Sequence, residues 1–241
     1  MRKKPMLAYP VSDKPINYED KVFMQPKLDG VRCVIQYEWQ DSKDEPGEVY
    51  DKVVKAYSRT GKEWKNIDHI LFNLEPWFQL NPNVILDGEL YNHSLKDNFE
   101  KIISLVRKTK PTDEDRLEAA QYTEFHCYDI IDETKTFEER MNFITQTVPR
   151  NHTIKHVPTM LVPTESQAKV NHARNLDSGY EGSILRTNDT YACKRSHNLR
   201  KFKDFSDAEA TIVGYLDGKG KRTGTLGKFI MQDDEGIEFG C

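Results

Sequence analysis

The sequence lacks any long hydrophobic run. Of its 241 residues 37% are hydrophobic, and no apolar segment approaches the roughly 20 residues that a membrane-spanning helix needs. The charged start, Met1 to Pro5, is not followed by the apolar segment of a secretory signal peptide. We therefore expect a cytoplasmic, globular protein with no membrane partner, large enough for one domain or for one domain plus a small appendage.

Cysteine is also scarce, and the four cysteines are widely scattered at Cys33, Cys127, Cys193 and Cys241. None has the spacing of a zinc ribbon or a redox pair, so we expect free thiols in a reducing compartment. Internal repeats, heptads and low-complexity segments are absent as well. These absences argue against a zinc-stabilised protein and a repeat protein.

Positive charge is in deficit, because the formal net charge is -4. This argues against a uniformly basic nucleic-acid binder. The distribution is uneven, however: residues 194 to 228 hold nine basic and four acidic side chains, a surplus of five, which leaves -9 for the remainder. A basic tract on an acidic body favours a protein that grips a phosphate backbone on one face, although a solvated charged surface would look the same.

The expected elements mix strands and helices without a regular alternation, which predicts an α+β fold. Residues 1 to 20 resemble an extended lead-in, and 41 to 48 a loop. Period-two patterns predict strands at 22–24, 31–37, 53–57, 84–86, 125–131, 157–162, 210–216 and 226–232. Helices are predicted at 66–78, 97–106, 111–121, 136–144 and 164–179.

Capping signals support these helices. Asn66 is the expected cap of the first helix. Asp97 with Glu100, and Thr136 with Glu139, have the spacing of capping boxes. A domain boundary is expected near residues 204 to 208, before the last two strands.

The segment from Gln25 to Arg32 (QPKLDGVR) lies between two apolar runs. Asp29-Gly30 predicts a hairpin turn between strands 22–24 and 31–37. Lys27, beside Pro26 and two residues before a carboxylate, would then present its amine from a rigid edge, as a nucleophilic lysine requires. The alternative is a plain hairpin with solvated turn residues. Lys, Asp, Gly and Arg at these four positions would arise by chance on the order of once per thousand chains of this length.

The segment resembles the nucleotidyl-attachment motif of the superfamily of DNA ligases, RNA ligases and mRNA capping enzymes, in which the lysine becomes bonded to a nucleoside monophosphate. Further motifs follow in the family's order: SRTG at 58–61, DGEL at 87–90, FHCYD at 125–129, EGSILR at 181–186 and KFK at 201–203. The resemblance implies a nucleotidyltransferase (ATP-grasp-like) adenylation domain at 1–204 and the start of an OB-fold domain at 205–241. That tail is too short for the roughly five strands of a complete barrel.

The resemblance implies catalytic roles for three lysines. Lys27 is the nucleophile, and Lys201 and Lys203 lie near the reactive phosphate and contact the nucleotide. Attack requires a deprotonated Lys27, which nearby cations and partial burial would favour by lowering its pKa. For Lys201 and Lys203 the competing interpretation is non-specific binding of a phosphate backbone.

Five further residues are expected at the nucleotide. Glu89 contacts the ribose hydroxyls, Tyr128 stacks on the base, and Gln25 and Arg32 complete the nucleotide site. Glu181 serves a divalent metal, and ligands that are only oxygens imply Mg²⁺ or Mn²⁺ rather than zinc. In the competing interpretation the two glutamates are strand-end surface residues and Tyr128 is a core aromatic.

DNA contacts are expected from Asp29, Arg59, Arg195, Lys221 and Arg222. Asp29 is placed near the reacting 3′ hydroxyl, although stabilisation of the turn would explain it equally well. Arg59 is expected at the nucleotide or the nick phosphate. Arg195 lies upstream of the KFK motif and is expected to contact the DNA, and Lys221 and Arg222 are expected at the DNA backbone.

Together these motifs imply an ATP-dependent DNA ligase of small, viral type. It would seal nicks in duplex DNA through a lysyl-AMP and a DNA-adenylate, using ATP and Mg²⁺, as a monomer in the cytoplasm of a host cell, during DNA replication, repair or recombination. Two alternatives stay open. An RNA ligase or mRNA guanylyltransferase would share Lys27, Glu89 and Glu181. A non-catalytic nick-binding protein would share the basic tract but form no covalent adduct.

Overall fold

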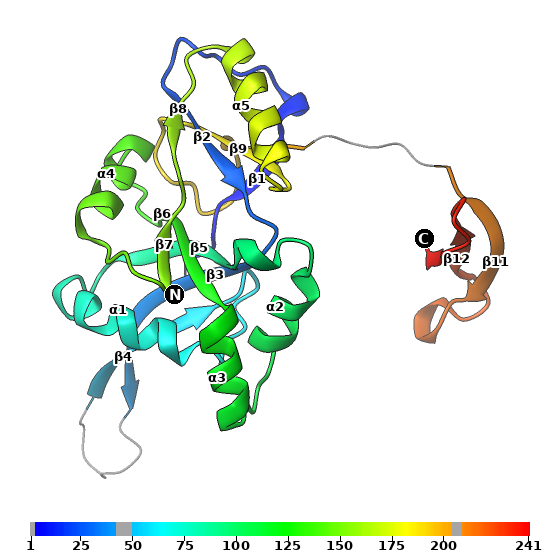
Figure 1. Cartoon of the computed structure of the whole chain (residues 1–241), viewed down its shortest axis with the longest axis horizontal. Coiled ribbons are helices and arrows are strands. Elements are labelled where there is room, and N and C mark those ends of the chain that lie inside the picture. The colour runs from blue at the N-terminus through cyan, green and yellow to red at the C-terminus, as the bar shows by residue number, and fades with distance from the viewer. Residues whose placement is uncertain (1–2, 42–49, 204–208) are drawn as a thin grey trace. The chain divides into compact units, whose positions relative to one another are not determined.

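The structure is a computed structural model that describes residues 3–41, 50–203 and 209–241. It divides the chain into two compact units, Met1–Lys203 and Asp204–Cys241 (Figure 1). Within the described ranges no helix has the length and apolarity needed to cross a membrane. The boundary expected at 204–208 and nearly all of the loop expected at 41–48 lie outside the described residues.

The first unit contains two five-stranded sheets. The first sheet has the strand order β1 (Leu7–Pro10), β10 (Arg195–Phe202), β9 (Gly182–Thr187), β2 (Val22–Lys27) and β8 (Met160–Leu161). The second has the order β4 (Tyr50–Tyr57), β3 (Val31–Asp41), β5 (Ile85–Tyr91), β6 (Glu124–Ile130) and β7 (Ile154–His156). Most neighbouring strands are antiparallel, and only β1 with β10 and β6 with β7 are parallel among these pairs.

Five helices accompany the sheets: α1 (Asp68–Leu80), α2 (Phe99–Val106), α3 (Asp113–Tyr122), α4 (Phe137–Thr147) and α5 (Glu165–Asp177). α1 packs on β4 and α4 on β6, whereas α5 packs on β9 and β2 of the first sheet (Figure 1). The mixture of antiparallel strands and segregated helices confirms the α+β prediction.

Alternation along the strands sorts apolar side chains into separate cores. In β3, Cys33 and Ile35 face the core under the helices of the second sheet, whereas Val34 faces a small core that also contains Met6 and Leu199 of the first sheet. A third core lies between the first sheet and α5. Because successive residues of a strand point to opposite faces, the polar residues in phase with Val34 point toward the first sheet.

The hairpin expected at 22–37 is wrong. β2 pairs with β8 and β9, whereas β3 pairs with β4 and β5, so residues 28 to 30 connect two different sheets. Gly30 is needed for close approach, because a Cβ there would lie 2.6 Å from both Glu89 Cγ and the Leu90 carbonyl oxygen. The Asp-Gly signal therefore marks a tight crossing between sheets and not a two-residue turn.

The strand expected at 157–162 is likewise two strands. β7 ends at His156 and β8 begins at Met160, and each is the edge strand of its own sheet. The edge position predicted from Pro158 is confirmed, because proline cannot donate to a ladder. The prediction of an extended lead-in at 1–20 was incomplete, because Leu7–Pro10 form β1. The charged segment Arg195–Phe202 was not predicted as a strand and forms β10.

Helix caps follow the sequence signals only in part. The capping box of Thr136 with Glu139 is present at α4. Asn66 is not a cap; its buried amide donates to the Leu105 and Asp115 carbonyl oxygens, and α1 begins after Ile67. The box expected at Asp97 is absent, because α2 begins one residue later with Asn98 as its N-cap.

The second unit contains the three-stranded sheet β11 (Thr211–Asp217), β12 (Leu226–Gln232) and β13 (Glu238–Gly240), in that order. The strands expected at 210–216 and 226–232 are confirmed, and β13 was not predicted. The short 3-10 helix Gly220–Arg222 lies in the connection between β11 and β12.

The two capping assignments can be tested against each other. We expect Thr136→Ala to lower the free energy of unfolding by about 1 kcal/mol, because its hydroxyl caps α4. Asp97→Ala, which removes no cap, should change it by less than about 0.5 kcal/mol. Urea unfolding followed by circular dichroism measures both values. Equal losses would contradict the observed start of α2.

Candidate active site

The predicted site residues meet in a pocket of about 320 Å³ between the two sheets. It is lined by Leu7, Ala8, Gln25, Pro26, Lys27, Leu28, Arg32, Arg59, Glu89, Tyr128, Ile184, Arg186, Arg195, Leu199 and Lys201. Eight of the thirteen residues singled out from the sequence are in this set. They come from segments spread over more than 170 positions of the sequence, so only the fold brings them together.

Lys27 is the last residue of β2, and its ammonium group donates to Glu181. Lys203 contacts the other carboxylate oxygen of Glu181, so this carboxylate lies between two lysines. Burial lowers the pKa of Lys27 below 10.5, against the charges of Glu89 and Asp29. Burial and the charge of Lys27 also lower the pKa of Lys203. The neutral, nucleophilic form of Lys27 is thus more accessible than that of an exposed lysine.

Three strands of the second sheet supply Arg32, Glu89 and Tyr128. Arg32 lies directly opposite Glu89 in the register of β3 and β5, so both project from the same face. Tyr128 is the extra residue at a register shift between β5 and β6, where Asp87 pairs with Asp129 and Gly88 with Cys127. Such bulges re-aim a side chain, and here the ring lines the pocket.

Glu89 is a partly buried acid with few compensating contacts. The Tyr128 hydroxyl donates to its carboxylate at 3.2 Å. Burial raises the pKa of Glu89 to about 7, although the charges of Arg32 and Lys27 and the Tyr128 hydrogen bond oppose the shift. This carboxyl group therefore changes charge near neutral pH.

Arg32 is anchored below the pocket. Its guanidinium forms a two-pronged contact with the buried carboxylate of Asp87, with Nε to Oδ1 at 2.6 Å. The Tyr191 hydroxyl donates to Asp87 Oδ2 at 2.6 Å and accepts from the Met6 backbone N–H at 2.7 Å. Arg32 thus ties the segment before β1 to the second sheet.

Gln25 is fixed by a second buried network. Arg186 Nε donates to Gln25 Oε1 at 2.8 Å, and Arg186 Nη1 donates to Asp129 Oδ2 at 2.6 Å. Arg140 also donates to Asp129 at 2.6 Å. Because the amide oxygen is taken by Arg186, the Gln25 amide nitrogen donates to the Tyr128 carbonyl oxygen and to Thr159 Oγ1. The orientation of Gln25 in the pocket follows from its hydrogen bonds to Arg186, Tyr128 and Thr159.

Five predicted residues lie outside the pocket lining. Glu181 and Lys203 contact Lys27 as described, and the exposed Asp29 acts on Lys27 through its charge. Arg222 is exposed in the second unit. The side chain of Lys221 lies outside the described residues.

Sequence reasoning missed several pocket residues. Ile184 and Arg186 alternate with Leu185 of the α5 core, so period two places them on the pocket face of β9. The signal for Arg186 was a charge inside an apolar strand, which needs a buried partner. Leu7 and Ala8 gave no signal, because their contribution depends on the parallel pairing of β1 with distant β10.

The site can hold a phosphorylated ligand with an apolar ring. Tyr128 and Ile184 offer flat and aliphatic surfaces, while Lys27, Lys201 and Arg59 supply positive charge. Among the described residues no group of three or more His, Cys, Asp or Glu side chains could hold a metal ion by itself. Mg²⁺ typically binds one or two carboxylates together with substrate phosphates, and Glu181 suits that arrangement.

Comparison with known proteins gives a consistent result. The family described as "ATP dependent DNA ligase domain" matches residues 5–203. The DNA ligase of Enterobacteria phage T6 is 25% identical over a 274-residue alignment, which covers 96% of this chain and 54% of the phage protein. The DNA ligase of Enterobacteria phage T4 is 24% identical with the same coverage. The chain thus spans about half the length of these curated relatives.

Solved structures share the fold. A structure described as "DNA binding with a minimal scaffold: Structure-function analysis of Lig E DNA ligases" has a TM-score of 0.72, with 23% identity, and the match covers 100% of this chain and 84% of that one. The ATP-dependent DNA ligase from bacteriophage T7, in complex with ATP, has a TM-score of 0.59 and 16% identity, with 99% and 80% coverage. At these identities the likeness establishes the fold alone.

The protonation of Glu89 can be tested directly. We expect the carboxyl group to titrate at about pH 7, and Tyr128→Phe to raise its pKa further by removing a hydrogen bond to the charged form. Carbon-13 NMR of labelled glutamate, with Glu89→Gln to assign the resonance, measures both values. A titration close to the ordinary value of 4.5 would contradict the burial of this group.

The same shift has a thermodynamic consequence. Because folding raises this pKa, the protonated carboxyl group is favoured in the folded state. Its contribution to stability is therefore fully present below about pH 4.5 and is lost as the pH rises through about 7. Glu89→Gln should flatten this part of the pH profile of stability.

Proposed function

The chain belongs to the ATP-dependent DNA ligase domain family, and from this premise we propose that it seals nicks in duplex DNA through a lysyl-AMP on Lys27 and a DNA-adenylate. One observation carries the proposal: the Lys27 amine contacts Glu181 at the mouth of a pocket that also contains Glu89 and Tyr128. The name of the family implies use of ATP. The phage relatives that the chain resembles are DNA ligases.

In the first step Lys27 Nζ attacks the α-phosphorus of ATP. A nitrogen–phosphorus bond forms, the bond to the bridging oxygen breaks, and pyrophosphate leaves. Burial of Lys27 raises the fraction of neutral amine available for attack. Lys201, which lines the pocket, and Lys203, which contacts the same carboxylate as Lys27, stabilise the charge that develops on the phosphate.

The nucleoside is held by the residues of the second sheet and β9. The base lies between Tyr128 and Ile184, both of which line the pocket. Glu89 accepts hydrogen bonds from the ribose hydroxyls in its ionised form, so binding strengthens as the pH rises through about 7. Gln25, oriented by Arg186, and Arg32, anchored by Asp87, complete the pocket.

Glu181, together with the phosphates of ATP, would hold Mg²⁺ or Mn²⁺, and the bound ion would neutralise phosphate charge. The carboxylate of Glu181 is already surrounded by the cationic groups of Lys27 and Lys203, which is an environment that suits a further cation only when phosphates accompany it.

The two later steps take place at the nick. A 5′-phosphate oxygen attacks the phosphorus of lysyl-AMP and releases Lys27; the 3′ hydroxyl then attacks the 5′-phosphate and releases AMP. Arg59 and Arg195 contact the nick phosphate, and Asp29 lies near the 3′ hydroxyl. Lys221 and Arg222 contact the DNA backbone from the second unit.

This assignment fits a two-domain arrangement, with an adenylation domain at 1–204 and a partial OB-fold domain at 205–241. We propose that the protein acts as a monomer in the cytoplasm, of a host cell if it is viral. Activity on nicked DNA, nicked RNA and GTP separates nick sealing in DNA from the RNA ligase and guanylyltransferase alternatives. A DNA ligase uses ATP in preference to GTP, and nicked DNA in preference to nicked RNA.

The nucleophile is tested by mass. Incubation with ATP and Mg²⁺ should add one adenylate to the protein, and Lys27→Ala should reduce this labelling at least about 100-fold, because the attacking amine is lost. Intact-mass measurement followed by peptide mapping gives the site. Lys21→Ala is the matched control, since Lys21 immediately precedes the same strand but pairs with Glu138 on the surface. Adenylate mapped to Lys201 or Lys203 in the Lys27 variant would overturn the assignment.

Base stacking is tested at pH 8, where Glu89 is ionised. Tyr128→Ala should weaken ATP binding by about 1–3 kcal/mol, or roughly 5- to 150-fold, whereas Tyr128→Phe keeps the ring and should lose far less affinity, through the higher pKa of Glu89 alone. Isothermal titration calorimetry measures both affinities. Equal losses of ATP affinity in both variants would show that the hydroxyl group carries the effect. Unchanged affinity in both variants would show that Tyr128 is a core residue and not a stacking residue.

A further inference from the structure

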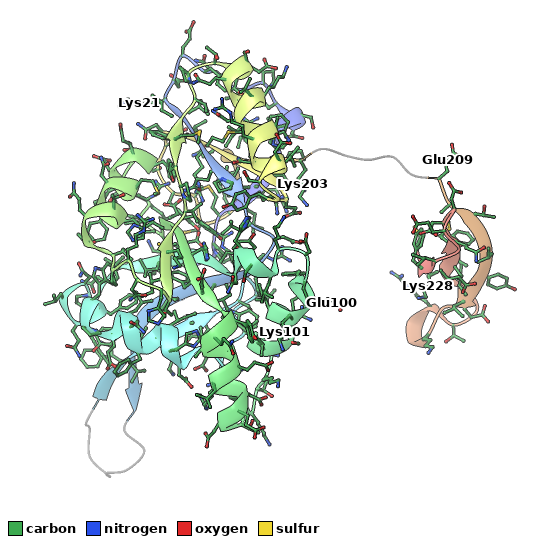
Figure 2. All side chains as sticks on the ribbon, in the orientation of Figure 1. Lys21, Glu100, Lys101, Lys203, Glu209 and Lys228 are labelled. Carbon is green, nitrogen blue, oxygen red and sulfur yellow. The ribbon has the colours of Figure 1, made fainter. Side chains whose placement is uncertain are left out.

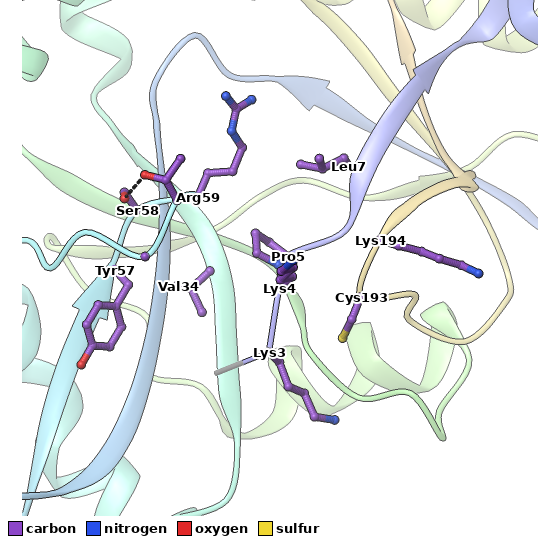
Figure 3. Close-up of a pocket in the computed structure, with 12 residues that line it drawn as sticks. Lys3, Lys4, Pro5, Leu7, Val34, Tyr57, Ser58, Arg59, Cys193 and Lys194 are labelled. Atoms are coloured by element: carbon purple, nitrogen blue, oxygen red, sulfur yellow. Dashed lines mark hydrogen bonds between the residues drawn. The ribbon is translucent and has the colours of Figure 1, made fainter. Parts of the chain in front are cut away.

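A second and larger hollow, of about 480 Å³, lies beside the nucleotide pocket (Figure 3). Its walls come from four parts of the sequence: residues 3–7, Val34 of β3, residues 57–61 at the end of β4, and residues 193–194 before β10. Figure 3 shows Pro5, Leu7 and Val34 in the central part of the view, with the side chains of Lys3, Arg59 and Lys194 extending outward. None of the family motifs except SRTG contributes to it.

The lining holds four basic residues, Lys3, Lys4, Arg59 and Lys194, and no acidic residue. This differs from the chain as a whole, which has more acidic than basic residues. Lys3 alone has a carboxylate partner, Glu133, at 2.9 Å. The structure gives Lys4, Arg59 and Lys194 no ion pair with any of the described residues.

Surface lysines elsewhere in the first unit are commonly neutralised. Lys21 pairs with Glu138, and Lys101 pairs with Glu118; both lysines are labelled in Figure 2. A cluster of cations left without carboxylates, around an apolar floor, is complementary to a ligand that carries repeated negative charges and less polar groups between them. A nucleic-acid strand, with its phosphates and deoxyriboses, has that pattern.

The wall that carries Lys4 is firmly held. Met6, two residues on, is buried, and its backbone N–H donates to Tyr191, which is bonded to the buried Asp87. The turn that carries Arg59 is closed by the Gly61 N–H donating to the Ser58 carbonyl oxygen at 2.9 Å. The backbone of the hollow is therefore built before any ligand arrives.

The two pockets share Leu7 and Arg59. In the proposed reaction the AMP occupies the first pocket and is joined to the 5′-phosphate at Arg59. The DNA strand that carries this 5′-phosphate therefore continues past Arg59. We propose that this second hollow binds the backbone of the strand that carries the 5′-phosphate, with phosphates at Lys4 and Lys194 and deoxyribose on the floor of Pro5 and Leu7. This inference rests on the proposed function and adds to it two residues, Lys4 and Lys194, outside the family motifs.

The test uses the double variant Lys4→Glu/Lys194→Glu. Its affinity for nicked duplex DNA should fall roughly 10- to 100-fold at low salt, and the slope of log Kd against log salt should become shallower by about two, one for each phosphate contact. The matched control is Arg107→Glu/Lys110→Glu, which makes the same charge change at exposed residues that line neither pocket. The control should retain the wild-type affinity within about threefold.

The strand is identified with neutral methylphosphonate linkages. Placed in the first few positions of the 5′-phosphate strand, they should weaken binding to the wild-type protein but not to the Lys4/Lys194 variant. The same linkages in the 3′-hydroxyl strand should weaken binding to both proteins equally. Sensitivity confined to the 3′-hydroxyl strand, or equal loss in the control variant, would overturn the assignment.

Adenylate labelling of Lys27 is measured on every protein to separate the two proposals. If the wild-type protein is labelled with adenylate but the Lys4→Glu/Lys194→Glu variant binds nicked DNA normally, the inference about the second hollow is wrong and the proposed function stands. Loss of labelling in the double variant would also overturn it, because the two lysines would then serve the nucleotide pocket. Wild-type protein that neither labels with ATP nor seals a nick would overturn the proposed function, whatever the binding measurements give.

Discussion

The carboxylate of Asp129 is the contact on which the pocket depends. It is fully buried on β6 of the second sheet and receives Arg140 from α4 and Arg186 from β9 of the first sheet. A buried charge without a partner costs several kcal/mol, so loss of the contact between β9 and β6 would leave the buried Arg186 without its carboxylate partner. The same Arg186 fixes Gln25, two residues before Lys27. The position of Lys27 is thus supported by an ion pair on the side of β2 that faces the pocket.

Burial moves the two central titratable groups in opposite directions. It lowers the pKa of Lys27 and raises the pKa of Glu89 to about 7. The proposed reaction needs a neutral Lys27 and an ionised Glu89, and both forms become more populated as the pH rises. One property of the pocket, its low exposure to water, therefore favours the nucleophile but requires a pH near or above 7 for the ribose contact. Arg32 limits the shift of Glu89, because its charge lies across the same strand pair.

The motif residues could be predicted from the sequence, whereas their scaffold could not. Order and spacing identified Lys27, Glu89, Tyr128 and Lys201, all of which line one pocket. The Asp29-Gly30 pair led to a wrong prediction of a hairpin, because a close crossing between sheets and a tight turn both require glycine at this position. β1 and the role of Arg186 depend on pairings across more than 150 residues, which local patterns do not contain. The capping signal at Asp97 failed for a smaller reason, a shift of one residue in the start of α2.

The distribution of paired and unpaired cations connects the two pockets into one path. Arg32 and Arg186 are locked to buried carboxylates and serve the architecture, so they are not available as mobile phosphate ligands. Arg59, by contrast, is exposed and lines both hollows. On a chain of net negative charge, a polyanion is repelled by most of the surface and attracted where acids are missing. The carboxylate-free lining beyond Arg59 is such a place, and it begins where the nucleotide pocket ends. We therefore infer that the location of the missing acids, more than the number of bases, sets the path of the proposed DNA strand.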